Sequence, residues 1–180
     1  MEPLLIVLAV IILIVIIWYI STSNKLNVAI VKIDEADSGI DVALTKRYDV
    51  LTKMLDVTKA YAKHEAETLT AVVNLRKGMT TKEKAVANNQ MSEVFSKLNV
   101  VAENYPELKS SENFQRLQLS IADVEEHLQA ARRLYNANVS SYNQLIVTFP
   151  TSIVANSKKL GKKDFFEAEE TKKQDVEMKF

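Results

Sequence analysis

The stretch from Ser110 to Phe149 constrains the fold more than any other part of this chain. Its apolar and aromatic residues recur in steps of three and four, so they share one face of an α-helix about 60 Å long at about 1.5 Å per residue. Because no helix of that length is stable alone in water, the pattern predicts an elongated bundle of helices. The positions on this face are Phe114, Leu117, Ile121, Val124, Leu128, Ala131, Tyr135, Asn138, Tyr142, Leu145 and Phe149.

The composition agrees with a helical protein. Only 3 glycines and 3 prolines occur in 180 residues, which favours helix throughout and predicts an all-α fold. The 23 basic residues balance the 23 acidic ones, so we expect no nucleic-acid partner. The absence of cysteine excludes disulfides, thiolate metal sites and a cysteine nucleophile.

An apolar run from Leu4 to Ile20 contains only Leu, Ile, Val, Ala, Trp and Tyr. As a helix it would rise about 26 Å, so we expect a transmembrane helix at 4–20 after a short outer tail at 1–3. Trp18 and Tyr19 are expected at the membrane–water interface. A cleaved signal peptide is the alternative, but the run is long and only Glu2 is charged before it, which favours an uncleaved anchor.

The flanking charges predict the orientation of this span. Lysine and arginine are absent before it, and Lys25, Lys32, Lys46 and Arg47 follow it. Positive residues stay preferentially on the cytoplasmic side. We therefore expect a single-pass cell-membrane protein with its N-terminus outside and its helical body in the cytoplasm.

The helical body is expected at 21–156, with an irregular C-terminal tail at 157–180. Capping-box spacing from Thr80 to Glu83 starts one helix, and Pro106 ends it near Asn104. Short connections predict three long helices packed antiparallel, up-down-up, and Phe165–Phe166 could dock the tail against them. The expected helices cover about 24–75, 81–104, 110–149 and, as a short fourth, 150–156.

Several polar and aromatic residues fall on or beside the predicted apolar faces. Arg47 is expected to bond a carboxylate on another helix, such as Glu103 or Asp123. The repeated Tyr-Asn pairs predict ring packing with amides that fix helix register, or alternatively a ladder that grips a partner. This polar cluster or partner surface comprises Asp37, Arg47, Tyr48, Asp49, Glu103, Tyr135, Asn136, Asn138, Tyr142 and Asn143.

A series of ordered motifs resembles the LemA family of bacterial membrane-anchored helical proteins over nearly the whole chain. The resemblance implies an N-terminal span with a short outer tail, then a long antiparallel bundle, and no established enzymatic activity. The motifs are Ile33-Asp34-Glu35-Ala36, Ile40-Asp41-Val42, Lys46-Arg47-Tyr48-Asp49, Tyr61-Ala62, His64-Glu65, Ala102-Glu103-Asn104-Tyr105-Pro106-Glu107-Leu108-Lys109, Glu112-Asn113-Phe114, Arg116-Leu117-Gln118, Ala131-Arg132-Arg133, Tyr135-Asn136, Tyr142-Asn143, Phe149-Pro150 and Phe165-Phe166.

The chain departs from the family pattern on its first helix. Asp37 stands where the family usually has Trp, and Leu51-Thr52-Lys53 replaces the usual Ile-Pro-Asn. A carboxylate buried alone costs several kcal/mol, so it must be paired, solvated or turned away. We expect this end of the bundle to be solvated or to form a contact surface.

Nothing in the sequence predicts catalysis, a cofactor or a metal. His64 and His127 lack the Glu-x-x-His spacing of a bundle metal site and the second histidine of a zinc motif. A glycine-poor bundle also supplies neither an oxyanion hole nor a phosphate loop. We expect a non-enzyme.

The expected function is a membrane-anchored scaffold or interaction module, with the bilayer and unidentified proteins as partners. The alternatives are an envelope-side structural or chaperone-like bundle, and a ligand-sensing pocket between helices near Arg47. Homo-oligomerisation stays open, because coiled-coil-like faces are present but the span lacks a GxxxG motif.

Overall fold

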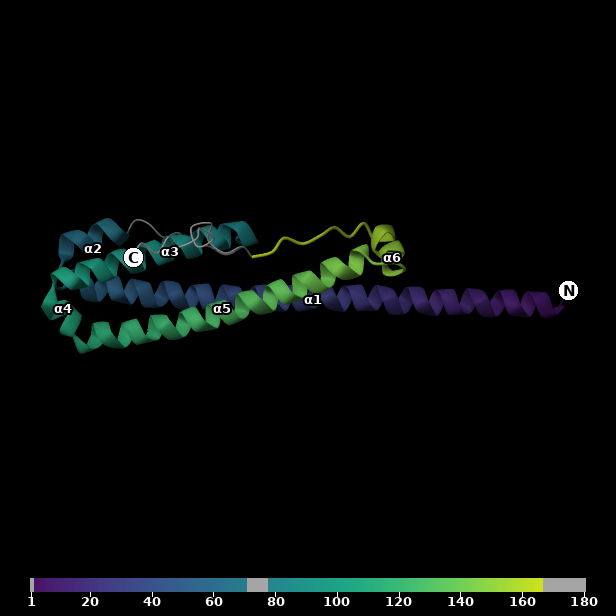
Figure 1. The fold of residues 1–180 in the computed structure, drawn as a ribbon, viewed down its shortest axis with the longest axis horizontal. Coiled ribbons are helices and arrows are strands. Elements are labelled where there is room, and N and C mark those ends of the chain that lie inside the picture. Colours follow the sequence, from purple (N-terminus) through teal and green to yellow (C-terminus); the bar gives the residue numbers. More distant parts are fainter. Residues whose placement is uncertain (1, 71–77, 167–180) are drawn as a thin grey trace, which may run out of the picture. The chain divides into compact units, whose positions relative to one another are not determined.

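The computed structural model describes residues 2–70 and 78–166, and these residues form helices and their connections without any β-strand (Figure 1). The all-α class is confirmed. The helices in these two ranges are α1 (Glu2–Lys59), α2 (Lys63–Thr70), α3 (Thr81–Asn104), α4 (Pro106–Ser110), α5 (Glu112–Val147) and α6 (Thr151–Ser157).

The chain divides into two compact units. Unit 1 comprises Met1–Asp37 and Leu134–Asp164, and unit 2 comprises Ser38–Arg133 and Phe165–Phe180. Each unit therefore takes one part of α1 and one part of α5.

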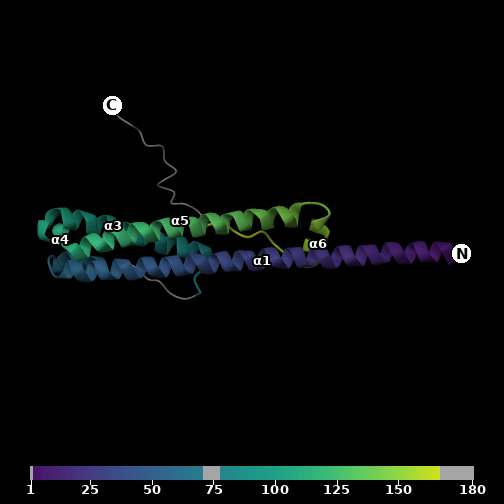
Figure 2. The same ribbon diagram turned by 90° about the horizontal axis from the view of Figure 1, so that it is seen from below.

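The apolar run begins α1, which continues through it as one helix of 58 residues (Figure 2). Its large apolar side chains from Leu4 to Ile17 are all about half exposed or more. In the described ranges, α1 is the one helix long and apolar enough to cross a membrane. The run is thus a candidate membrane span, and no turn separates it from the helix that follows.

The expected first helix, 24–75, is wrong at its C-terminal end, because α1 ends at Lys59. The chain turns at Ala60 and Tyr61, whose N–H groups donate to the carbonyls of Val57 and Thr58 at 3.2 and 3.0 Å. The Thr58 hydroxyl also donates to the Met54 carbonyl, a contact that bends helices. No glycine or proline marks this turn, and the expected residues 71–75 lie outside the described ranges.

The capping box at the start of α3 is confirmed. Thr80 Oγ1 accepts from the Glu83 N–H at 3.3 Å, and Glu83 Oε2 accepts from the Thr80 N–H at 2.7 Å. The helix ends at Asn104, where Tyr105 precedes proline and leaves the helical conformation.

The expected third helix, 110–149, differs from the structure at both ends. Pro106 opens the separate short helix α4, because proline suits the first turn, and the extended backbone of Ser111 interrupts the chain before α5. At the other end α5 stops at Val147, short of Pro150, and α6 occupies Thr151–Ser157 rather than 150–156. Phe149, expected on the buried face, is 77% exposed.

Both long helices bury residues at seven-residue intervals. On α1 these positions are apolar except for Arg47. On α5 the expected face is correct up to Tyr135, after which Val139 and Ile146 are buried more deeply than Asn138 and Leu145. The positions at intervals of seven are Leu26, Ile33, Ile40, Arg47 and Met54 on α1, and Phe114, Ile121, Leu128, Tyr135 and Tyr142 on α5.

Candidate functional sites: a buried arginine and a bound tail segment

Arg47 is the largest fully buried side chain in the described chain, with 2% of its surface exposed. It stands where the seven-residue spacing of α1 otherwise places Leu, Ile or Met, so its guanidinium enters the core of unit 2. A buried guanidinium needs hydrogen bonds and a counter-charge. The structure supplies both.

Three side chains from two other helices surround the guanidinium. Nη1 donates to the Asn88 carbonyl at 2.9 Å and to the Asn88 side-chain oxygen, and Nη2 donates to Ser92 Oγ at 3.0 Å. Nη2 also forms an ion pair with the carboxylate of Glu125 on α5. The Arg47 cluster, comprising Arg47, Asn88, Ser92 and Glu125, therefore links α1, α3 and α5.

The expected ion pair between Arg47 and a carboxylate on another helix is present, but its carboxylate is Glu125 rather than Glu103 or Asp123. Both of these side chains are exposed, and Asp123 lies 3.7 Å from His127 on its own helix. Glu125 projects from a different side of α5 than Asp123, because residues two positions apart on an α-helix point about 200° away from each other. The carboxylate that can enter the bundle is therefore Glu125.

A second buried cation lies close by in the same unit. Lys84 is 3% exposed, and its Nζ pairs with Asp41 Oδ1 at 2.7 Å. Asp41 itself remains largely exposed. This pair joins α3 to α1 and neutralises the lysine, as Glu125 neutralises the arginine.

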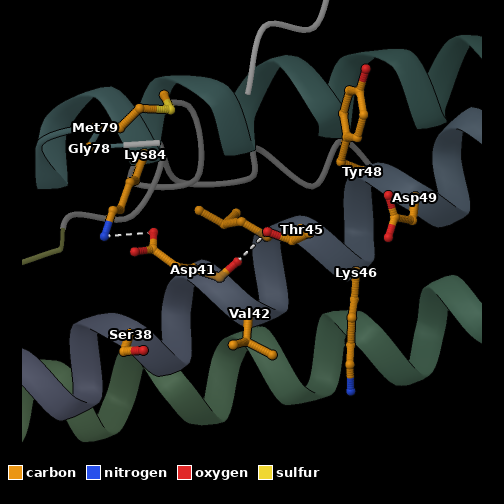
Figure 3. A pocket seen from close by; sticks show the side chains of 11 residues that line it. Ser38, Asp41, Val42, Thr45, Lys46, Tyr48, Asp49, Gly78, Met79 and Lys84 are labelled. Carbon is orange, nitrogen blue, oxygen red and sulfur yellow. Dashed lines mark hydrogen bonds and ion pairs between the residues drawn. The ribbon is translucent and has the colours of Figure 1, made fainter. Parts of the chain in front are cut away.

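A pocket of about 840 Å³ opens beside this pair, and Figure 3 shows Lys84 and Asp41 at one end of it. Tyr48 and Asp49 line its other end, while Lys46 is directed away from Tyr48. Arg47 is not among the lining residues, so the cavity is distinct from the Arg47 cluster. Its charged groups could orient a small polar molecule. The lining residues are Ser38, Asp41, Val42, Leu44, Thr45, Lys46, Tyr48, Asp49, Gly78, Met79 and Lys84.

The residues of the predicted polar cluster are divided between the two units. Arg47, Tyr48, Asp49 and Glu103 lie in unit 2, where Tyr48 and Asp49 face the pocket and Glu103 is exposed. The remaining six residues lie in unit 1. Among these, Asp37, expected on or beside the apolar face, is only half-buried. Its neighbour Ala36 is buried instead.

The Tyr-Asn repeats of α5 bind the backbone of the chain's own tail in unit 1. The Tyr135 and Tyr142 hydroxyls donate to the carbonyls of Asp164 and Gly161 at 3.2 and 3.0 Å. Asn143 makes two bonds with Lys163: its Nδ2 donates to the carbonyl, and its Oδ1 accepts from the N–H, both at 2.9 Å. The tail segment 161–164 thus runs antiparallel to α5, held by backbone contacts.

One of the two remaining asparagines, Asn138, forms a bond between helices of the kind predicted to fix their register. Asn138 Nδ2 donates to the Lys32 carbonyl of α1 at 2.9 Å, a cross-helix bond of the expected kind. Asn136 is half-buried.

In unit 2, Phe166 is 2% exposed, and the Arg132 guanidinium carbon lies 4.9 Å from its ring centroid. The tail therefore docks as the Phe165–Phe166 pair suggested, through Phe166, while Phe165 is exposed.

Trp18 and Tyr19, the two residues expected at the membrane–water interface, lie at the end of the apolar run. Trp18 is half-buried, and the Tyr19 hydroxyl lies 3.1 Å from Ser157 Oγ in α6. Four residues further along α1, Ser23 accepts from Lys158 Nζ at 3.0 Å. The short fourth helix is therefore fixed to α1 where the apolar run ends.

The described residues Glu65, Tyr105 and Tyr142 have shifted pKa values. Bonds from its own backbone and from the Tyr105 hydroxyl, at 2.8 Å, lower the pKa of Glu65 below its usual 4.5. The same bond to Glu65 raises the pKa of Tyr105. Burial raises the pKa of Tyr142, whose hydroxyl donates to the Gly161 carbonyl.

Sequence reasoning missed Asn88, Ser92, Glu125 and Lys84. Asn88 is buried inside α3, where its carbonyl accepts from Arg47. The available signal was the seven-residue spacing of Lys84, Met91 and Leu98, which places a lysine on the apolar face of α3. Within the described ranges, no group of three or more His, Asp or Glu side chains is placed to hold a metal.

Comparison with known proteins agrees with the motif pattern. The LemA family model matches residues 36–180. A curated relative, Protein LemA of Metamycoplasma hominis, is 31% identical over 164 residues, which cover 88% of this chain and 75% of the relative. The chain therefore belongs to the LemA family.

Proposed function

We propose that the chain is a single-pass membrane protein whose helical body serves as a non-catalytic interaction or scaffolding module at the cytoplasmic face. The observation that carries the anchor is the apolar run itself. Its side chains from Leu4 to Ile17 are exposed, so they are not the core of a soluble domain. In water such a surface would be a strong aggregation site, whereas in a bilayer it is the expected surface of a span.

The orientation rests on the charges around the span. Lys25 and Lys32 follow it on exposed positions, and no lysine or arginine precedes it. The scaffolding role rests on the body, where the buried charges are used to join helices.

The absence of cysteine provides a direct test of the topology. Single cysteines would replace Pro3 on the outer side, and exposed Lys82 and Asn113 in the body. Intact cells would be treated with a membrane-impermeant maleimide. We expect labelling at position 3, and protection at 82 and 113 until the cells are lysed. The reverse pattern would move the body to the envelope side and favour the structural or chaperone-like alternative.

A ligand-sensing role is the second candidate, and the pocket beside Lys84 and Asp41 favours it. Asp49→Asn and Tyr48→Ala would alter the pocket wall without touching the Arg47 cluster. If the pocket senses a ligand, these variants should fold normally but lose the phenotype of the wild-type gene. Normal folding with an unchanged phenotype would instead support the scaffold.

A further inference from the structure

The turn between α5 and α6 lies against the part of α1 where the apolar run ends. In both views α6 lies beside α1, well short of the N-terminus (Figure 1, Figure 2). Tyr19 contacts Ser157 at 3.1 Å, and Lys158 Nζ reaches Asn27 Oδ1 at 2.6 Å. All of these residues belong to unit 1. If Tyr19 lies at the membrane–water interface, α6 lies at the same level.

This turn exposes large apolar side chains that the core of unit 1 does not use. Phe149 is 77% exposed, Val147 is 58% exposed and Ile153 is 53% exposed. Together with Pro150 they form what we call the α5–α6 corner, residues 147–153. Single exposed apolar residues are ordinary, but a group of them beside a membrane span indicates contact with lipid.

The charges around the corner all have one sign. Residues 18–33 of α1 and residues 134–163 contain no aspartate or glutamate, although acidic and basic residues balance over the whole chain. The lysines are exposed, apart from the half-buried Lys158. They are Lys25, Lys32, Lys158, Lys159, Lys162 and Lys163.

We propose that the α5–α6 corner and three of these lysines form a second membrane-contact surface, which binds an anionic phospholipid bilayer beside the span. Phe149 and Ile153 enter the interfacial region, where aromatic and apolar side chains are stable. Lys25, Lys159 and Lys162 meet lipid phosphates, as juxtamembrane basic residues do. Lys158 is held by Ser23 and Asn27, and Lys32 lies about 20 Å beyond Tyr19 along α1 at about 1.5 Å per residue. This inference rests on the proposed membrane anchor. It adds that unit 1 lies on the bilayer surface through a second element.

Depth-dependent quenching would test the apolar contact. Phe149→Cys in the full-length chain would carry an environment-sensitive fluorophore in proteoliposomes that contain nitroxide-labelled lipid. Phe149 is mostly exposed, so its replacement removes no core packing. Leu134→Cys is the matched control, because Leu134 is 57% exposed on the same helix and in the same unit. It lies about 20 Å before Val147 along α5 at about 1.5 Å per residue. Ile12→Cys reports on the span.

Each outcome decides between the proposals. Quenching and a blue shift at positions 12 and 149, without either at 134, would support the second contact surface. Quenching at 12 alone would overturn it and leave the anchor intact. Quenching at none of the three positions would overturn the anchor and the corner together. Equal quenching at 149 and 134 would also overturn it, because the contact would not be specific to the corner.

The lysines provide the second test. We expect the blue shift at position 149 to be larger in vesicles containing phosphatidylglycerol than in pure phosphatidylcholine. The double variant Lys159→Gln/Lys162→Gln should lose this difference. A matched pair of exposed lysines in unit 2, Lys53→Gln/Lys109→Gln, should keep it. An identical shift in both lipids for the wild-type chain would overturn the electrostatic part of the proposal.

Discussion

Units 1 and 2 both bury polar groups between helices, but the groups bind different kinds of partner. In unit 2, Arg47 bonds mainly to side chains, those of Asn88, Ser92 and Glu125. In unit 1, Tyr135, Tyr142 and Asn143 bond to backbone atoms of the tail segment 161–164. The first arrangement depends on the identity of each partner residue. The second requires only a chain in the correct conformation, so changes in the tail sequence should be tolerated.

The largest effect should come from Arg47→Ala. Removing one member of a buried charge pair typically costs about 3–5 kcal/mol, and here Asn88 would also lose its partner. Because Glu125 can still reach water, we expect the lower end of that range. Thermal unfolding of the detergent-solubilised chain, followed by circular dichroism, would measure it. Arg47→Lys should recover only part of the stability, since lysine lacks the planar fork. An unchanged midpoint for Arg47→Ala would show that the cluster does not stabilise unit 2.

A smaller loss is expected from Asp41→Asn in the same unit. The substitution leaves the buried Lys84 ammonium beside a neutral amide. Weakening the pairing of a buried polar group in this way typically lowers the free energy of unfolding by about 1–3 kcal/mol. The same unfolding measurement applies, and Asp56→Asn is the control because its pair with Lys59 is largely exposed. If both variants behaved alike, the burial of Lys84 would have no energetic consequence.

In unit 1, Asn143→Ala should release the tail segment locally. It removes two hydrogen bonds, each contributing about 1 kcal/mol net, while global unfolding should change less. Hydrogen exchange at the Lys163 amide, which donates to Asn143 Oδ1, is the direct measurement. Lys163→Ala/Asp164→Ala should leave tail protection unchanged, because only backbone atoms are bound. Loss of protection in that control would remove the distinction between the two units.

The smallest effect concerns acid pH. The pKa of Glu65 is lowered in the folded chain, by its backbone bond and by Tyr105. A lowered carboxyl pKa contributes stability that is present above the unfolded value of 4.5 and is lost as the pH falls through the folded value. The difference in thermal midpoint between wild type and Glu65→Gln should therefore shrink below that pH. A constant difference from neutral to acid pH would contradict this assignment.

The sequence predicts the helical faces well and their partners poorly. Periodicity located Ile121, Leu128 and Tyr135 because one helix repeats one face. It could not choose Glu125 over Asp123 as the partner of Arg47, because that choice depends on how α5 is rotated in the bundle. The turn at Ala60–Ala62 was missed because alanine and tyrosine carry no helix-breaking signal. The Tyr-Asn repeats were visible, but their partner was not, since a non-helical segment has no periodicity to read.

The unbroken passage of α1 from the apolar run to Asp37 sets an angular relation within unit 1. Each residue turns the helix by about 100°, so one residue inserted between Tyr19 and Leu26 would rotate the lipid-facing run by that angle relative to the face that buries Leu26 and Ile33. An insertion of seven residues would rotate it by only about 20°. A seven-residue insertion should therefore nearly preserve the angle between the two faces, but it would move Tyr19 about 10 Å along the helix axis away from Ser157 at about 1.5 Å per residue. The span and the helix that follows it thus form one rigid element rather than a flexible tether.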